Sequence, residues 1–264
     1  KNETNLARLA GENRQQADLE GLGFFKNDVT RLYHEFMIYG GYPEVVLTDD
    51  FSQKKKVLQE IVRAYILKDI RNIFQVEKID SFNNLVKTIA LQVGQLLNNA
   101  SLARDCRTTR ITAEKYCHIL EDTFIIQRIP PLFTNKKKEL RRMPKVYFHD
   151  SGLRNYLAQN FLAFSHRVDR GQLLENAVFS ALWKTRGIMD HLYFWHTADG
   201  KEVDFIVQRE GDFIPFEVKV KRAAVAHLKR FNELYNCPEM NLVRLDSDTV
   251  QPVPGVNIIP PWII

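Results

Sequence analysis

The feature that most constrains the fold is a pair of alternating segments, EVDFIVQ (202–208) and FIPFEVKV (213–220), separated by only four residues. Apolar and polar side chains alternate along both with a period of two, which predicts half-buried β-strands. The link between them contains Gly211, which suits a tight hairpin. A third strand is predicted just before them, at HLYFWH (191–196). The last third of the chain is therefore expected to contain an antiparallel meander.

Helical patterns flank these three strands. Residues 171–187, GQLLENAVFSALWKTRG, predict a helix before them, and residues 223–235, AAVAHLKRFNELY, predict one after them. A last strand is predicted at NLVRL (241–245). A strand that follows a helix in this way usually joins the sheet through a parallel crossover. The predicted order is therefore helix, three strands, helix, strand.

The first hundred residues predict helices that serve the core. Apolar residues recur at helical spacing from Val57 to Phe74 and from Leu85 to Leu97. GGYPEVV (40–46) predicts a turn because glycine and proline are clustered there. Residues 1–30 are only weakly patterned.

Residues 97–150 predict a helix-turn-helix followed by a hairpin. Ser101 is expected to cap a short helix, SLARDC, and Thr109 or Thr112 is expected to cap a longer one. Two strands are predicted after these helices, FIIQRI (124–129) and KVYFHD (145–150). This order of elements describes a winged helix.

The hairpin encloses a basic segment, KKKELRRMPK (136–145), which holds six cations and one anion. Its charge equals the formal net charge of the whole chain, +5, so the remainder sums to zero. Concentrated positive charge is typical of a surface that binds a polyanion. A solvated loop is the alternative. If this region is a winged helix, the tip residues Lys136, Lys137, Lys138, Arg141 and Arg142 are expected to contact DNA phosphates.

The second helix of the predicted helix-turn-helix is a poor match to a DNA groove. Three of its five exposed positions are expected to be acidic, which is unfavourable beside phosphate. A winged helix also serves as a protein-docking or structural module, so both interpretations remain open. The five positions are Glu114, Lys115, His118, Glu121 and Asp122.

Cysteine usage and hydropathy bound the cellular context. There are three cysteines and no CxxC, which supports neither a disulfide framework nor a zinc knuckle. This usage fits a reducing cytoplasm. No apolar run approaches the roughly 18 residues of a membrane span, and no signal peptide opens the chain. We expect a cytoplasmic protein without a membrane partner.

The hairpin register brings charged residues together. If the loop is Glu210–Gly211, or all four residues 209–212, Asp204 falls directly opposite Glu217, and Lys219 lies one diagonal away. Like charges in that position destabilise a hairpin. Water, Lys219 or a hard divalent cation such as Mg²⁺ could offset the repulsion. The simpler alternative is a solvated strand face with a cross-strand ion pair. The opposite, buried face is expected to hold Val203, Phe205, Val207, Phe216, Val218 and Val220.

Glu175 supplies a third acid. It lies at the margin of the apolar stripe of the helix at 171–187, close to Phe179 and Leu182 on a helical wheel. A buried carboxylate without a partner is costly. We therefore expect the helix to aim Glu175 at the edge of the sheet that carries Asp204 and Glu217.

These residues resemble a known constellation. Glu175 on a helix, Asp204 on a strand and Glu217-Val218-Lys219 on the next strand are similar to the PD-(D/E)XK nuclease-like superfamily. More specifically, several ordered motifs resemble a family of predicted bacterial and archaeal AAA+ type ATPases of unknown function. Members carry a nuclease-like domain after a winged helix. The motifs are GGYPEVV, TNKKKELRRMPKVYFHDSGLRNYL, LLENAVFSAL, KEVDFIV and FEVKV.

The resemblance covers the part of that family after its ATPase core. No P-loop, GxxxxGK[ST], occurs here, so this chain is not expected to hydrolyse ATP by itself. It implies an α+β fold with an α-β-β-β-α-β restriction-endonuclease-like domain at residues 161–264. A winged-helix-like domain would occupy residues 76–160. Residues 1–75 would be helical, as a candidate remnant of an ATPase lid.

The resemblance also implies roles. Asp204, Glu217 and the carbonyl of Val218 would bind Mg²⁺ or Mn²⁺. Lys219 would orient or help to deprotonate the attacking water, or stabilise the transition state. Glu175 would hold a metal-bound water or a second ion. The expected reaction is phosphodiester hydrolysis in DNA. Lys221, Arg222, Lys229 and Arg230 are near enough in sequence to contact the phosphates. An ATPase domain of the same polypeptide, or an oligomer, would be a further partner. The alternative is a non-catalytic DNA- or protein-binding regulatory module of the ATPase.

Overall fold

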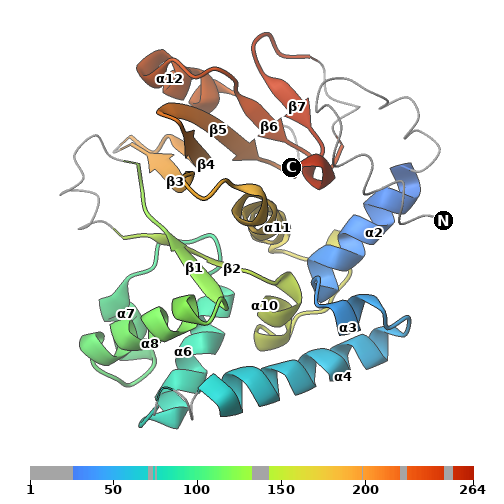
Figure 1. Ribbon diagram of the computed structural model, residues 1–264, viewed down its shortest axis with the longest axis vertical. Coiled ribbons are helices and arrows are strands. Elements are labelled where there is room, and N and C mark those ends of the chain that lie inside the picture. The colour runs from blue at the N-terminus through green and yellow to red at the C-terminus, as the bar shows by residue number, and fades with distance from the viewer. Residues whose placement is uncertain are drawn as a thin grey trace.

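The described part of the chain has a mixed α+β fold, with helices in its N-terminal part and a five-stranded sheet in its C-terminal part (Figure 1). The structure is a computed structural model. None of its described helices is both long and apolar enough to span a membrane. The residues described are 26–70, 74, 76–132, 143–197, 199–220, 225–246 and 252–264.

The N-terminal helices begin earlier than predicted. Asp50 caps the main one by accepting a hydrogen bond from the N–H of Gln53, so this helix starts at Phe51 and not near Val57. It continues into a π-helical segment that ends at Ile70. The elements are α2 (Lys26–Tyr39), α3 (Pro43–Val46), α4 (Phe51–Ile61) and η2 (Val62–Ile70).

The predicted helix-turn-helix and hairpin are present, and we call this group the helix–hairpin unit. Asn98 caps the first helix of the turn, because its side-chain oxygen accepts from the N–H groups of Ala100 and Ser101. The prediction of Ser101 as the cap is therefore wrong. Thr109 caps the second helix by accepting from the N–H of Thr112 at 3.1 Å. The elements are α6 (Ile79–Leu91), α7 (Asn99–Asp105), α8 (Arg110–Asp122), β1 (Ile126–Ile129) and β2 (Lys145–Phe148).

The remaining elements form the sheet unit, in which the strands run in the order β3-β4-β5-β6-β7. The pairs β3–β4 and β4–β5 are antiparallel, and β5–β6 is parallel, so the predicted meander and parallel return are confirmed. The parallel edge strand β7 was not predicted. The sheet unit comprises α11 (Arg170–Thr185), β3 (His191–His196), β4 (Glu202–Arg209), β5 (Asp212–Val218), α12 (Ala226–Tyr235), β6 (Asn241–Val243) and β7 (Asn257–Ile259); α10 (Ser151–Leu157) and η3 (Phe164–His166) precede it and η5 (Pro261–Ile263) ends it.

The β4–β5 hairpin has the register predicted from the sequence. Arg209 pairs with Asp212, so the loop is Glu210–Gly211. Both loop residues have positive φ, 51° and 98°, as the preferred two-residue hairpin turn requires. The paired ladder runs back to Phe205 opposite Phe216, one step from Asp204 and Glu217.

A β-bulge in β4 changes which side chains share a face. Tyr193 of β3 lies opposite Ile206, but Trp195 lies opposite Val203, so β4 has one extra residue between these pairs. Val203 consequently joins Ile206 in the smaller apolar cluster, while Phe205 belongs to the main core. The expectation that Val203 and Phe205 share one buried face is wrong because the bulge shifts the alternation next to Asp204.

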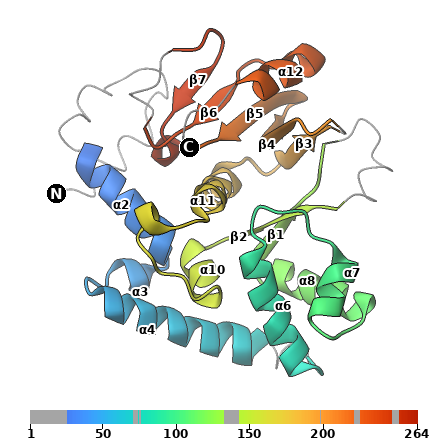
Figure 2. The ribbon, with the colours of Figure 1, turned by 180° about the vertical axis from the view of Figure 1, so that it is seen from behind.

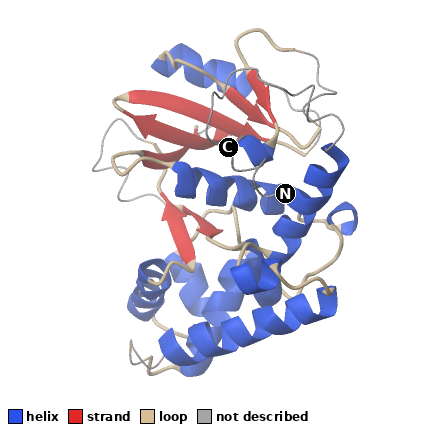
Figure 3. Ribbon diagram, turned by 45° about the vertical axis from the view of Figure 1, so that its right-hand side comes forward, coloured by secondary structure: helices blue, strands red, loops and turns tan. Residues whose placement is uncertain are grey.

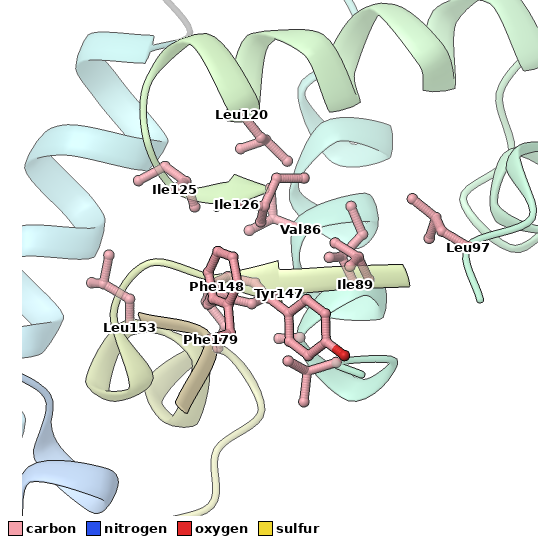
Figure 4. Close-up of a cluster of buried hydrophobic side chains, with 14 of the residues drawn as sticks. Val86, Ile89, Leu97, Leu120, Ile125, Ile126, Tyr147, Phe148, Leu153 and Phe179 are labelled. Carbon is pink, nitrogen blue, oxygen red and sulfur yellow. The ribbon is translucent and has the colours of Figure 1, made fainter. Parts of the chain in front are cut away.

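The main core joins the helix–hairpin unit to the sheet unit. Figures 1 and 2 show α11 between the five-stranded sheet and the helical part, and Figure 3 shows the β1–β2 hairpin as a separate small sheet. Tyr147 of β2 stacks on Phe179 of α11, with ring centroids 5.0 Å apart. Side chains from α6, α8 and β1 surround this contact (Figure 4). Strand β2 is therefore held against α11 by apolar packing.

Candidate functional site

Asp204 and Glu217 converge on one ammonium group. Lys219 Nζ lies 3.2 Å from Asp204 Oδ2 and 2.7 Å from Glu217 Oε1. The N–H of Val218 donates to Asp204 Oδ2 at 2.8 Å. Asp204 and Glu217 are only 5% and 2% exposed, so the alternative of a solvated strand face is wrong, although the cross-strand ion pair that it included is present between Lys219 and Asp204. The predicted convergence of the two acids with Lys219 is present.

One oxygen of this group is left without a partner. Glu217 Oε2 is buried and has no hydrogen-bond partner among the described residues. Burial raises the pKa of Glu217 to about 7, the charge of Asp204 adds to the effect, and Lys219 opposes it. An unpaired buried carboxylate oxygen is costly, so this site favours either a proton or a cation there.

The carboxyl group of Glu175, on α11, accepts hydrogen bonds from side chains of strand β2. Lys145 Nζ donates to Glu175 Oε1 at 3.2 Å, and the hydroxyl of Tyr147 donates to the same oxygen. Burial raises the pKa of Glu175 to about 7; the charge of Lys145 opposes this shift, and that of Asp204 adds to it. The helix thus aims Glu175 toward the Asp204 edge, as expected, but its direct partners come from β2.

Lys145 was counted as the last cation of the basic segment and as the first residue of the strand predicted at 145–150; the strand is confirmed, but the side chain is buried and is not part of an exposed basic surface. It is 3% exposed, and its ammonium also contacts Glu202 Oε1 at 2.6 Å. Burial alone would lower the pKa of Lys145, but the charges of Glu175, Asp204 and Glu202 outweigh it and raise that pKa. Sequence reasoning missed Lys145, Tyr147 and Glu202 as members of this site. The available signal was the row of polar residues Lys145 and Tyr147 along one side of a strand.

The six charged residues form what we call the carboxylate cluster. Four carboxyl groups and two ammonium groups give it a formal charge of −2 when all are ionised. Four of its members line an open pocket of about 440 Å³, and the N-terminal turn of α11 also faces this pocket. The pocket-lining members are Lys145, Glu175, Glu202 and Lys219; the other two are Asp204 and Glu217.

The cluster offers oxygen donors but not a ready-made metal cage. Across the described ranges, no group of three or more His, Cys, Asp or Glu side chains is arranged to hold a metal ion. The carboxylates of Asp204 and Glu217, with the carbonyl of Val218 as the third donor expected from the sequence, are hard ligands of the kind that Mg²⁺ prefers. Glu217 Oε2, which has no hydrogen-bond partner among the described residues, is the oxygen of this set that remains open to a proton or a cation.

The acids of α8 have partners in the hairpin. Arg128 Nη1 lies 2.6 Å from Glu114 Oε1, and Arg128 Nη2 lies 2.7 Å from Glu121 Oε2. The Glu121 side chain is only 17% exposed, so the expectation that Glu114 and Glu121 project freely from the helix is wrong. Lys115, His118 and Asp122 are exposed as expected.

Most of the residues expected to contact DNA lie outside the part of the chain that the structure describes. Lys229 and Arg230 lie exposed on α12, where Arg230 pairs with Glu233 at 2.8 Å. The positions that fall outside the described residues are Lys136, Lys137, Lys138, Arg141, Arg142, Lys221 and Arg222.

Two family models match consecutive parts of the chain. The model described as domain of unknown function DUF8612 matches residues 30–163, just over half of the chain. The chain belongs to the DUF8612 family. A second model, described as domain of unknown function DUF4143, matches residues 170–264. The DUF8612 region therefore supplies Lys145 and Tyr147, and the DUF4143 region supplies the other members of the site.

Similar proteins occur in both bacteria and archaea. An uncharacterized protein of Haemophilus influenzae is 27% identical over 72% of this chain and 46% of its own length. One of Mycobacterium tuberculosis is 30% identical over 63% of this chain and 40% of its own length. One of Methanocaldococcus jannaschii is 26% identical over 69% and 40%, respectively. This chain thus spans less than half the length of these relatives, and no solved structure matches it significantly.

Proposed function

We propose that this chain carries a metal-dependent nuclease site of the PD-(D/E)XK type, which hydrolyses phosphodiester bonds in DNA. The observation that carries the proposal is the buried, unpartnered Glu217 Oε2 beside Asp204. Two buried carboxylates that share one ammonium leave a negative charge that water cannot reach. Perturbed acids beside a pocket mark candidate catalytic sites.

A divalent cation would balance the carboxylate cluster, because its formal charge is −2 when all six groups are ionised. Asp204, Glu217 and the Val218 carbonyl would hold Mg²⁺ or Mn²⁺. When bound, such an ion lowers the pKa of water and stabilises charge on phosphoryl oxygens. Burial, with the charge of Asp204 adding to it, raises the pKa of both Glu175 and Glu217 to about 7, so protons can replace the cation at the cluster near neutral pH.

Lys219 acts in this proposal as a fixed positive charge. Burial alone would lower its pKa, but Asp204 and Glu217 outweigh that effect and raise it, so the ammonium keeps its proton. A permanent cation beside the reacting phosphate stabilises developing charge rather than removing a proton. Glu175 has a pKa raised to about 7 and is not one of the proposed metal ligands, so in this proposal it accepts or releases a proton near neutral pH.

The helix–hairpin unit would assist DNA binding as a winged helix. Arg128 pairs with both Glu114 and Glu121, so its single positive charge offsets half of the negative charge of these two acids on α8. The resemblance to the C-terminal regions of AAA+ type ATPases makes an ATPase domain the expected partner within a longer polypeptide.

A second candidate function is a non-catalytic DNA- or protein-binding module. It is favoured by the position of the Lys219 ammonium, which already contacts both Asp204 and Glu217 and closes them into an ion-paired group. If Asp204 and Glu217 stay paired with Lys219, their carboxylates are not available to a metal ion. Such a site would bind DNA or protein without cleaving DNA.

Calorimetry with Mn²⁺ and nicking of supercoiled plasmid separate these functions. The wild-type chain should bind Mn²⁺ and nick DNA, whereas Asp204→Asn should lose metal binding and Lys219→Ala should lose cleavage. Lys56→Met, which removes an exposed lysine on α4, is the matched control and should behave as wild type. Absence of both metal heat and nicking in the wild type would overturn the nuclease proposal, and a gel shift without cleavage would support the second candidate.

A further inference from the structure

The backbone of strand β2 is hydrogen-bonded within the helix–hairpin unit. It pairs with β1 on one side, with Lys145 opposite Ile129. On its other side it bonds to residues 94–97: the N–H of Gly94 donates to the Val146 carbonyl at 2.8 Å, and the N–H of Leu97 donates to the Pro144 carbonyl at 2.7 Å. Both edges of the strand near Lys145 are therefore fixed by this unit.

The side chain of Lys145, in contrast, contacts residues of the sheet unit. Its ammonium contacts Glu175 of α11 at 3.2 Å and Glu202 of β4 at 2.6 Å, and it lies 5.4 Å from the ring centroid of Phe194 on β3. These partners come from three different elements of the sheet unit. Burying a lysine to 3% exposure is costly unless its charge is fully paired, and here two carboxylates pair it.

Tyr147 repeats this arrangement two residues later. Its hydroxyl donates to the same Glu175 oxygen that Lys145 contacts, and its ring packs on Phe179 and on Phe205. Residues two apart on a strand lie on the same side, so Lys145 and Tyr147 form one row directed at Glu175. The other oxygen of Glu175 faces Gly94, where an added Cβ would lie 3.4 Å away.

We propose that Lys145 is a positioning residue of the carboxylate cluster, which holds Glu175 and Glu202 at the pocket and makes the site a joint product of the helix–hairpin and sheet units. Tyr147 supports it by fixing the same oxygen of Glu175. The consequence for cleavage rests on the proposed nuclease function, whereas the pairing of Lys145 with Glu175 does not. Docking of β2 against α11 then becomes a condition for an assembled site.

A double-mutant cycle tests the pairing without reference to activity. Lys145→Met, Glu175→Gln and the double variant are unfolded in urea, with Lys56→Met as the control for loss of an exposed lysine. Lys145→Met should lower the urea midpoint, and the double variant should lose clearly less than the sum of the two single losses, because Gln removes the charge that Lys145 pairs. Additive losses would overturn the proposal.

Kinetics test the positioning role. Lys145→Met should lower kcat for plasmid nicking at least tenfold, with KM changed less than about threefold, and Lys145→Arg should restore part of the loss. Tyr147→Phe, which keeps the ring packing, should lower kcat a few-fold, and this milder variant serves if Lys145→Met does not fold. The losses of Lys145→Met and Glu175→Gln should not multiply in the double variant.

The two proposals fail in different ways. If folded Lys145→Met and Tyr147→Phe both retain wild-type kcat, the positioning role is wrong although the nuclease function stands. If the wild type neither binds Mn²⁺ nor nicks DNA, the nuclease function is wrong, and the urea cycle alone decides whether Lys145 holds Glu175.

Discussion

Two clusters of charged residues are built from similar side chains, but their carboxylate oxygens are partnered differently. In the helix–hairpin unit, Arg128 binds Glu114 and Glu121 through separate nitrogens, and its main-chain N–H donates to Glu121 at 3.0 Å. We call this group the Arg128 brace. Burial alone would lower the pKa of Arg128, but Glu121 and Glu114 outweigh it and raise that pKa. Charge-assisted contacts of this kind stabilise the packing of α8 on β1.

Both clusters hold two carboxyl groups for each cation, so formal charge does not distinguish them. They differ in hydrogen bonding: every carboxylate oxygen of the Arg128 brace has a partner, whereas Glu217 Oε2 has none among the described residues. The difference suggests a physical criterion: a brace pairs all its carboxylate oxygens within the protein, whereas a functional site leaves one open to a ligand or a proton. The two clusters should therefore respond in opposite ways to loss of one carboxylate.

The largest expected effect comes from Glu217→Gln. Cleavage should fall by about 10³-fold, equivalent to roughly 4 kcal/mol, because a metal ligand is lost. The melting temperature should stay the same or rise, because the substitution removes the charge from a carboxyl group whose buried Oε2 has no partner, while Lys219 keeps its pairing with Asp204. Glu121→Gln in the Arg128 brace should do the reverse, lowering stability and leaving kcat unchanged. Nicking assays and thermal unfolding on both variants check this pair.

A wild-type level of nicking by folded Glu217→Gln would show that this carboxylate has no part in cleavage. A fall in stability equal to that of Glu121→Gln would show that the two clusters are both structural.

Arg128→Met should produce the next largest effect. It leaves Glu121 half-buried beside Glu114 with the exposed ring of His118 as their remaining neighbour, and loss of the arginine costs about 2–3 kcal/mol when the acids keep some solvent contact. Urea unfolding measures this loss, and Lys115→Met, on the exposed side of α8, is the matched control. An unchanged midpoint would show that the brace contributes nothing to stability.

The pH dependence of stability tests the carboxylate cluster directly. The folded-state pKa of Glu217 is raised to about 7 from an ordinary value of about 4.3, so the folded protein binds more protons than the unfolded chain between these values. Protonated Glu217 therefore stabilises the folded state fully below about pH 4.3, and this stabilisation is lost as the pH rises through 7. In EDTA, wild type should lose about 2 kcal/mol more than Glu217→Gln between pH 5.5 and pH 8.

Excess Mn²⁺ should restore that loss at pH 8 and have little effect at pH 5.5, because the ion and the proton compete for the same oxygens. Urea unfolding at both pH values, with and without Mn²⁺, measures this. Parallel pH profiles for wild type and Glu217→Gln would contradict a raised pKa.

The sequence alone could predict the part of the site whose residues lie close together along the chain. The Glu210–Gly211 loop sets the β4–β5 register, and that register brings Asp204 and Glu217 together with Lys219. These contacts span at most 15 residues along the chain. The β4 bulge escaped prediction because it depends on pairing with β3, not on the alternation within β4.

The other half of the site depends on packing between distant segments. Lys145 lies 30 residues from Glu175 and 57 from Glu202, and nothing in its local pattern shows that a strand at the end of a basic segment will be covered by α11. The marginal position of Glu175 on its helix correctly indicated that it needs a partner. The identity of that partner followed only from the docking of β2 against the sheet unit.

Thr109→Ala should have the smallest effect and tests whether the Arg128 brace acts independently of the rest of α8. The Thr109 hydroxyl caps the helix by accepting from the N–H of Thr112, and loss of such a cap costs about 1 kcal/mol. Thr109 shares no partner with Arg128, so the urea losses of Thr109→Ala and Arg128→Met should add within about 0.5 kcal/mol. If the loss in the double variant differs from the sum of the single losses by more than this, the brace and the cap both prevent fraying of α8. The brace would then stabilise the whole helix rather than its contact with β1.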